Sequence, residues 1–220
     1  MAFFIDDVLD IHMLDTIVEA LQDESLFENG ARTAAGAARA VKNNEQARPS
    51  EDVVRGATKL LEKALLKNAD FKAVALPEKI VRLSFSRYTE GMRYGAHVDD
   101  AFIGGRRTDL SFTLFLSEPE SYGGGELVIQ RYDGDEQIKL PKGSLYLYPS
   151  DSLHYVAPVE FGTRLAAVGW VHSRVRMDEQ RAVLFDLDRA LRRLPRNDET
   201  HDIRLTLLRA RNSLLRMWAD

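Results

Sequence analysis

The hydrophobic residues of this 220-residue chain follow a helical repeat near both ends and a two-residue repeat between them. From residue 8 to 21 and from 53 to 65, apolar side chains recur at steps of three and four, which predicts amphipathic helices. From Lys79 to Arg174 the repeat is two, in short segments separated by turns of Gly, Pro and Asp. Short strands that follow one another without helices indicate a sandwich or a barrel.

These repeats predict an α+β fold with a double-stranded β-helix (jelly roll) core. We expect residues 1–78 to form an N-terminal helical support packed on the core, residues 79–174 to form the jelly-roll domain, and residues 175–220 to form a C-terminal two-helix hairpin. The Ala- and Gly-rich stretch 29–48 is expected to be an ordered loop. The hairpin carries an apolar stripe that needs burial, so it is expected to pack on the body or to form a homodimer interface.

The chain contains no cysteine and five histidines. Disulfides, Cys-ligated zinc and iron–sulfur clusters are therefore excluded, and a transition metal must be held by His, Asp or Glu. The net charge of −4 argues against a general attraction to nucleic acid. The acidic N-terminal segment differs from a signal peptide, and no apolar run approaches the roughly 18 residues that span a bilayer. We expect a cytoplasmic protein without a membrane segment.

A His-x-Asp sequence in the β-rich region is the first candidate metal motif. His97 and Asp99 are two residues apart, so in an extended segment both side chains project to the same face. His154 follows a turn and opens a later strand, which makes it the candidate third ligand. Two imidazoles and one carboxylate form the facial triad of non-haem Fe(II) oxygenases.

Arg164 lies ten residues after His154, at the start of the last strand. A buried guanidinium beside a metal site can hold a dicarboxylate through a bidentate ion pair while the other end of the acid chelates the metal. Taken alone, Arg164 fits a simpler role better, as a strand-start charge paired with Glu160.

The combination of His97, Asp99, His154 and Arg164 on a jelly roll resembles the iron(II)/2-oxoglutarate-dependent dioxygenases. The stretches RYGAHVDD, GGRRTDLSFTLFLSEPESYGGGELVI and GTRLAAVGWVHS are similar to the bacterial PKHD-type hydroxylases. The similarity extends over nearly the whole chain, including VKNNEQ near residue 41 and the C-terminal hairpin.

This resemblance implies an enzyme that couples decarboxylation of 2-oxoglutarate to hydroxylation of a C–H bond. It implies Fe(2+) bound by His97, Asp99 and His154, with Arg164 on the distal carboxylate of 2-oxoglutarate and with O2 as oxidant. It also implies L-ascorbate as a reductant. The substrate expected from the resemblance is a peptidyl proline-like residue or a small molecule related to iron uptake and siderophores.

Five further residues have two readings each. Tyr88 and Tyr94 precede the triad, where either phenol could contact the cosubstrate or pack in the core. Trp170 lies an even number of residues after Arg164, so both project to the same face of the last strand. Trp170 therefore either lines the site or fills the core. Arg106 and Arg107, in a glycine-flanked turn, either meet an acidic substrate or are solvated loop charges.

Two other functions use the same residues. The first is a non-catalytic cupin-like protein that holds a metal or a small ligand. The second is a nucleic-acid demethylase, a class that resembles this chain but carries a further arginine where this chain has Trp170. Together with the negative net charge, that difference makes nucleic acid an unexpected partner.

Overall fold

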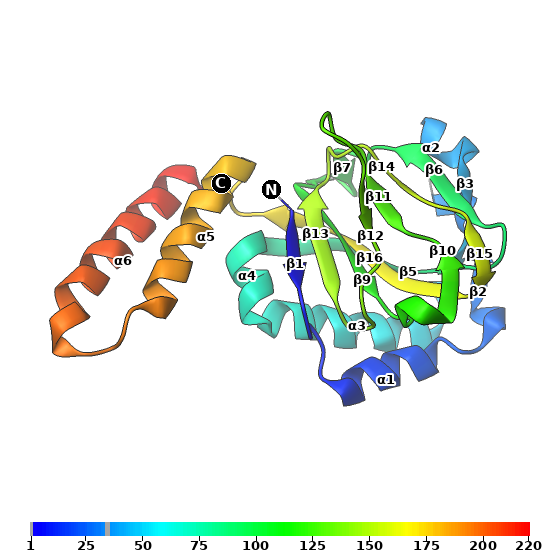
Figure 1. The fold of residues 1–220 in the computed structure, drawn as a ribbon, viewed down its shortest axis with the longest axis horizontal. Coiled ribbons are helices and arrows are strands. Elements are labelled where there is room, and N and C mark those ends of the chain that lie inside the picture. Colours follow the sequence, from blue (N-terminus) through cyan, green and yellow to red (C-terminus); the bar gives the residue numbers. More distant parts are fainter. Residues whose placement is uncertain (1, 34–35) are drawn as a thin grey trace.

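A computed structural model describes residues 2–33 and 36–220, whose core consists of two antiparallel sheets that face each other (Figure 1). The larger sheet has seven strands, in the spatial order β1 (Phe3–Ile5), β13 (Leu145–Pro149), β9 (Leu110–Phe115), β16 (Arg164–Ser173), β5 (Pro77–Tyr88), β4 (Glu45–Ala47) and β2 (Phe27–Asn29).

The smaller sheet has five strands, in the order β12 (Glu136–Ile138), β11 (Leu127–Ile129), β14 (His154–Val156), β6 (Arg93–His97) and β3 (Lys42–Asn43). Two short ribbons complete the strands, β10 (Tyr122–Gly124) with β15 (Val159–Gly162) and β7 (Phe102–Ile103) with β8 (Arg106–Arg107). The predicted α+β fold with a jelly-roll core and a C-terminal two-helix hairpin is confirmed.

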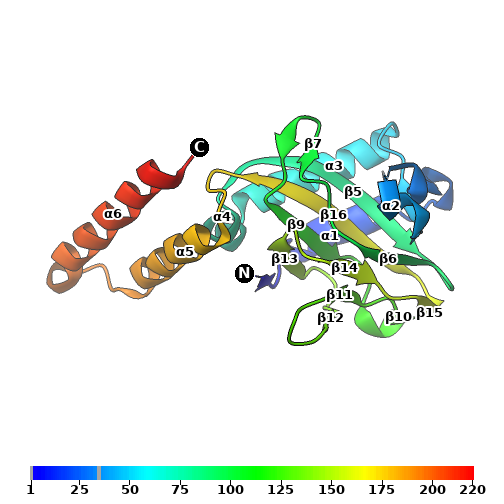
Figure 2. The ribbon, with the colours of Figure 1, turned by 90° about the horizontal axis from the view of Figure 1, so that it is seen from above.

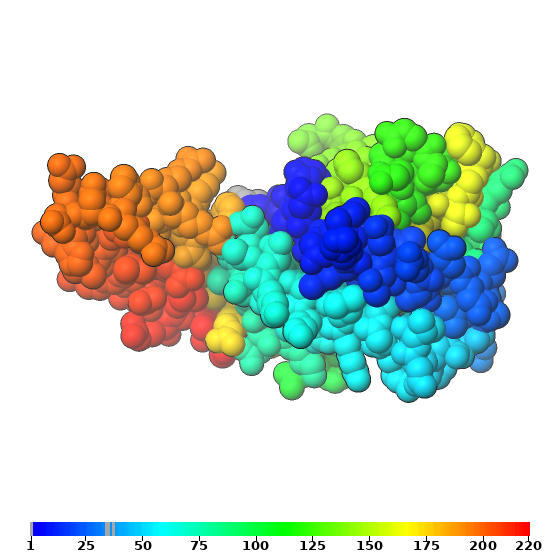
Figure 3. Space-filling model, turned by 90° about the horizontal axis from the view of Figure 1, so that it is seen from below, coloured from blue at the N-terminus to red at the C-terminus, as the bar shows by residue number. Residues whose placement is uncertain are grey.

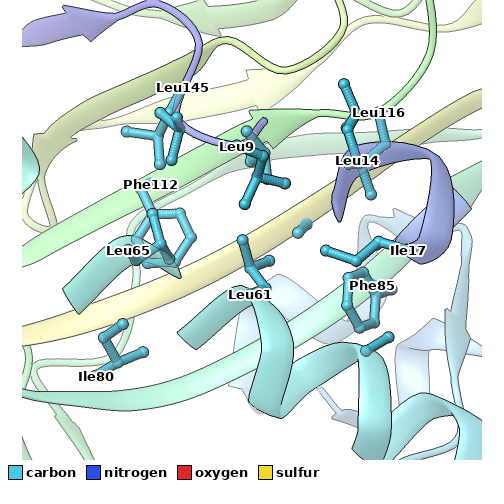
Figure 4. Close-up of a cluster of buried hydrophobic side chains, with 14 of the residues drawn as sticks. Leu9, Leu14, Ile17, Leu61, Leu65, Ile80, Phe85, Phe112, Leu116 and Leu145 are labelled. Atoms are coloured by element: carbon cyan, nitrogen blue, oxygen red, sulfur yellow. The ribbon is translucent and has the colours of Figure 1, made fainter. Parts of the chain in front are cut away.

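Helices cover the outer face of the larger sheet (Figures 1 and 3). They are α1 (Ile11–Ala20), α3 (Asp52–Lys67) and α4 (Ala69–Ala75). Their apolar faces are removed from water against the sheet, which is the main source of stabilisation for an amphipathic helix. Figure 4 shows this core, which includes Ile17, Leu61, Leu65, Phe85 and Phe112.

Side chains alternate along β5, so that one face of the larger sheet packs against the helices and the other lines a cavity between the sheets. Phe85 belongs to the core, whereas Tyr88 lines the cavity. Between Ile80 and Arg82 the register with β16 shifts, and Val81 has no partner there. This bulge lets Ile80 join the core while Arg82 lines the cavity, although both have the same parity.

The C-terminal hairpin consists of α5 (Asp178–Arg193) and α6 (Asp198–Trp218) and extends away from the sheets (Figure 2). One end of α6 packs on the body, where Leu215 and Trp218 contact a buried cluster around Val175. Leu205 and Leu208 stay 52% and 39% exposed. Helix α6 also packs along α5, but Leu205 and Leu208 of the apolar stripe keep much of their surface exposed.

The expectation of a loop over residues 29–48 is wrong. Apart from residues 34 and 35, which lie outside the described part of the chain, this stretch contains β3, β4, a 3-10 turn (Gly30–Thr33) and a short helix α2 (Gly36–Ala40). Strand β4 pairs with β5, and β3 pairs with β6. These strands of two or three mostly polar residues carry no apolar alternation, so only their neighbours define them.

The N-terminal segment also differs from expectation. The helix expected from residue 8 begins at Ile11, and Phe3–Ile5 forms an edge strand on β13. Among the described residues, no helix combines the length and the apolar character that a membrane crossing requires.

Candidate metal and cosubstrate site

Three side chains that could ligate a metal meet where β6 and β14 run side by side. His97 ends β6 and is the register partner of His154, which begins β14, and the two rings lie 4.2 Å apart. Asp99 follows two residues after His97. Its Oδ1 is 3.8 Å from His97 Nε2, and its Oδ2 is 3.9 Å from His154 Nε2. One ligand atom from each residue lies within 4.8 Å of the others, as a 2-His-1-carboxylate metal site requires.

Backbone carbonyls orient both imidazoles. His97 Nδ1 donates to the carbonyl of Gly95 and His154 Nδ1 donates to that of Ser152, each at 2.9 Å. Because a carbonyl only accepts, Nδ1 carries the proton in both rings and Nε2 keeps its lone pair. Those Nε2 atoms are the ones that face Asp99. Hydrogen bonds of this kind position metal-binding histidines in known metalloproteins.

The site favours neutral imidazole before any cation is present. Burial, and then the proximity of His154, lowers the pKa of His97 to about 4. At neutral pH the Nε2 lone pair of His97 is therefore available to a ligand. The ring of Tyr94 stacks on His97, with centroids 3.6 Å apart and planes 17° apart, and fixes the ring from the other side.

The carboxylate of Asp99 accepts a hydrogen bond from one serine, and a second serine contacts the first. Ser111 Oγ, on β9, donates to Asp99 Oδ2 at 2.6 Å and lies 2.9 Å from Ser150 Oγ. Ser111 and Ser150 are both buried. The distance and the charged acceptor indicate a strong hydrogen bond that fixes the carboxylate toward the imidazoles.

Arg164 is 1% exposed, and its Nε and Nη1 donate no hydrogen bond within the described residues. Its guanidinium lies 5.2 Å from the ring of Tyr88 and 5.4 Å from that of Phe115. The expected surface pair with Glu160 is absent, since no carboxylate in the described chain forms an ion pair with Arg164 and Glu160 is exposed. A buried, unpaired guanidinium is costly, and an anionic ligand would supply the missing partner.

Gly125 makes room for that arginine. Its φ is +67°, and a Cβ at this position would lie 3.1 Å from Arg164 Cδ and 3.1 Å from Tyr122. A larger residue would therefore be strained and would crowd the guanidinium.

One cavity contains the expected metal and cosubstrate residues together with the three aromatic candidates. His97, Asp99, His154 and Arg164 line it together with Tyr88, Tyr94 and Trp170. Burial raises the pKa of both phenols, so they stay protonated at neutral pH. Tyr88 is the register partner of Arg164, whereas Tyr94 stacks on the metal-ligating side. The structure thus places the two tyrosines at different parts of the same cavity.

The two loop arginines have different surroundings. Arg107 Nε donates to Asp109 at 2.5 Å and its Nη1 to Asp220 at 2.7 Å, so it joins the C-terminus to the body. Arg106 is exposed on β8.

Sequence reasoning missed several residues that line the cavity, above all Lys42, Arg82 and Ser111. Lys42 lies in the stretch expected to be a loop. Arg82 has the parity of Ser86 and Tyr88, which line the cavity, but also that of Ile80, which joins the core beyond the bulge, so parity alone did not assign its face. Ser111 alternates with apolar residues on β9, and that period was the one available signal.

Two known protein families match successive parts of this chain. Residues 83–172 match the family described as the 2OG-Fe(II) oxygenase superfamily, and residues 178–220 match the PKHD-type hydroxylase C-terminal domain. A PKHD-type hydroxylase of Parvibaculum lavamentivorans is 50% identical over 96% of this chain and 94% of its own length. Another, from Crocosphaera subtropica, is 43% identical over the full length of both chains.

Solved structures resemble this chain in fold. A prolyl hydroxylase of Trichoplax adhaerens, in complex with a peptide fragment of the hypoxia inducible factor oxygen degradation domain, has a TM-score of 0.59 at 16% identity and covers 83% of this chain and 86% of its own. A Pseudomonas putida prolyl-4-hydroxylase has a TM-score of 0.54 at 19% identity, over 79% and 92%.

Proposed function

Because this chain belongs to the PKHD-type hydroxylases of the 2OG-Fe(II) oxygenase superfamily, we propose that His97, Asp99 and His154 bind its Fe(2+) and that Arg164 binds 2-oxoglutarate. The reaction is hydroxylation of a C–H bond in a peptidyl proline-like or small-molecule substrate. L-Ascorbate as a reductant and a role in iron uptake stay predictions from the family.

The observation that supports this proposal most is the buried guanidinium of Arg164, with two unpaired donors, in the cavity that also contains the triad. The triad alone would suit a metal-storing protein. An unpaired buried cation beside it has no structural use within the described chain, and a dicarboxylate that bridges the metal and the arginine gives it one.

Iron(II) bound with 2-oxoglutarate and O2 supplies the oxidising chemistry, which yields succinate, CO2 and a hydroxylated product. The chain's own residues supply position and charge. Gly95 and Ser152 carbonyls keep the Nε2 atoms of the two histidines unprotonated, and Ser111 keeps Asp99 turned toward them. Arg164, whose side chain is buried, would neutralise the distal carboxylate.

The enzymatic function is tested by loading the protein anaerobically with Fe(II) and 2-oxoglutarate and then admitting O2. We expect a weak metal-to-ligand absorption band before O2 and succinate after it, at a basal rate that the true substrate increases. Binding of both ligands without any succinate, even with ascorbate and a broad substrate panel, would favour the cupin-like binding protein instead.

Further features concern the alternative functions and the partners of this protein. Trp170 lines the cavity where the nucleic-acid demethylases carry an arginine, which argues against that function. The exposed Leu205 and Leu208 of α6 support a homodimer through the hairpin. The division into residues 1–78, 79–174 and 175–220 and the cytoplasmic location stay predictions.

Replacing Ser111 with alanine is expected to weaken Fe(II) binding about 10- to 100-fold, the usual effect of losing a hydrogen bond to a metal ligand. The variant removes the donor to Asp99 Oδ2 and leaves the three ligands in place. Titration with Co(II), followed by its visible absorption, measures the affinity. Ser213→Ala on the exposed face of α6 is the control, and equal affinities in all three proteins would contradict a positioning role for Ser111.

A further inference from the structure

We propose that the substrate carries an oxyanion, a carboxylate or a phosphate group, which Lys42 and Arg82 bind in the part of the cavity not used by Arg164. This inference rests on the proposed function, because it assigns the substrate class of the same site.

Arg82 points into the cavity from the larger sheet. On the paired strands β5 and β16, Arg82 lies opposite Trp170, and Tyr88 lies opposite Arg164. These two residue pairs are six positions apart along both strands. At about 3.3 Å per residue, the backbones of these pairs are separated by roughly 20 Å. Arg82 therefore belongs to a different region of the cavity from Arg164.

Arg82 also lacks a partner. Within residues 2–33 and 36–220, it forms no ion pair or hydrogen bond with another side chain, although it is partly buried. The other partly buried arginines nearby do have partners, as Arg87 pairs with Glu45 at 2.7 Å and Arg107 with Asp109. An arginine without an internal counter-ion that lines a cavity is free to bind a planar oxyanion with its guanidinium fork.

Lys42 approaches the same space from the smaller sheet. Its Nζ forms no ion pair with a carboxylate of the described chain. It donates a hydrogen bond to Thr33 Oγ1 at 3.0 Å and lies 5.0 Å from the ring centre of Tyr94. Tyr94 in turn stacks on His97, so the ammonium lies one aromatic ring from the metal ligands. Burial, and then the charge of Arg82, lowers the pKa of Lys42 to about 8. The two cations thus repel each other across the cavity.

A third donor, on the register partner of Arg82, lines the same cavity. Trp170 Nε1 is buried and has no hydrogen-bond partner in the described part of the chain. Buried indole N–H groups usually find an acceptor, and each one left without an acceptor is costly. An oxyanion near Arg82 would offer an acceptor to the indole beside it.

The charged side chains that line the cavity also favour an anionic substrate. They are the cations Lys42, Arg82 and Arg164 and the carboxylates Asp99 and Asp100. Asp99 is assigned to the metal and Arg164 to 2-oxoglutarate, which leaves two cations against one exposed carboxylate. A substrate with a negative group restores the balance in a partly desolvated space, and a neutral or cationic substrate does not.

The test observes Trp170 directly, because the chain has only two tryptophans. Protein with 15N-labelled indoles is loaded with Zn(II) and saturated with N-oxalylglycine, which blocks the cosubstrate subsite. Phosphate, N-acetyl-L-proline and N-acetyl-L-prolinamide are then titrated separately. Trp218→Phe assigns the two indole signals.

We expect phosphate or N-acetyl-L-proline to shift the Trp170 signal saturably and to leave Trp218, on α6, unchanged. The neutral amide should have no effect, and the tighter of the two anions tells carboxylate from phosphate. Arg82→Gln and Lys42→Met should each weaken the binding at least tenfold. Arg209→Gln removes an equal charge from an exposed position on α6 and should leave the affinity unchanged.

Any one of these results would overturn the proposal: no Trp170 shift with either anion at millimolar concentration, an equal shift with the amide, or an equal loss of affinity in Arg209→Gln. Displacement of N-oxalylglycine by the anions would do so as well, because Lys42 and Arg82 would then serve the cosubstrate. The zinc protein does not turn over. Oxyanion binding without succinate in the iron protein would therefore refute only the enzymatic function, and succinate without oxyanion binding only this inference.

Discussion

Succinate formation in His97→Ala and in Asp99→Ala is expected to fall to the level of a control that contains Fe(II) and 2-oxoglutarate without protein. Each variant removes one of three ligand atoms that lie within 4.8 Å of one another. A metal held by the remaining two would lose both the affinity and the facial geometry that leave three positions for cosubstrate and O2. Asp99→Ala also removes the only anionic ligand.

The measurement combines metal analysis after gel filtration with an assay of succinate. His12→Ala, on the exposed surface of α1, is the control for a histidine outside the site. Circular dichroism should show unchanged secondary structure, since both ligands lie at a cavity wall. Retained metal and activity in either variant would remove that residue from the ligand set.

Arg164→Gln is expected to raise the KM for 2-oxoglutarate about 30- to 5000-fold. Loss of one partner of a buried, hydrogen-bonded charge pair costs about 2–5 kcal/mol, and each 1.36 kcal/mol corresponds to a factor of ten. Arg164→Lys keeps the charge but loses the bidentate fork, so its KM should lie between those of wild type and Arg164→Gln. Turnover at saturating 2-oxoglutarate should change less than KM does.

Thermal unfolding provides a second readout for the same arginine. Without cosubstrate the guanidinium is buried and unpaired, so Arg164→Gln should unfold at the same or a higher temperature than wild type. Adding 2-oxoglutarate with Zn(II) should raise the Tm of wild type and leave that of the variant nearly unchanged. An unchanged KM, or an equal Tm gain in both proteins, would refute the assignment of Arg164.

Local periodicity accounts for most of the fold that could be predicted. The two-residue repeat located β5, β9 and β16 because one face of each strand packs against helices. The same reasoning failed for β3 and β4. Both strands are too short to show a repeat, and their hydrogen bonds come from β6, β5 and β2, which lie elsewhere in the chain.

Arg164 shows the limit of residue-by-residue reasoning about the site. Its position next to a strand start suggested a surface ion pair with Glu160, because most strand-start charges are solvated. The structure buries it behind Tyr88 and beside Gly125, a position that depends on how β16 pairs with β5 and how the β10–β15 ribbon folds over it.

By itself the sequence determined the layout of helices and strands, the exclusion of thiol chemistry and the two-residue spacing that aims His97 and Asp99 at one point. These are local properties, set by backbone geometry over a few residues. Only the tertiary structure decided that His154 lies beside His97, and that Lys42 and Arg82 face each other across the same cavity. Those contacts join strands far apart in the chain, where sheet register, rather than local spacing, determines which side chains meet.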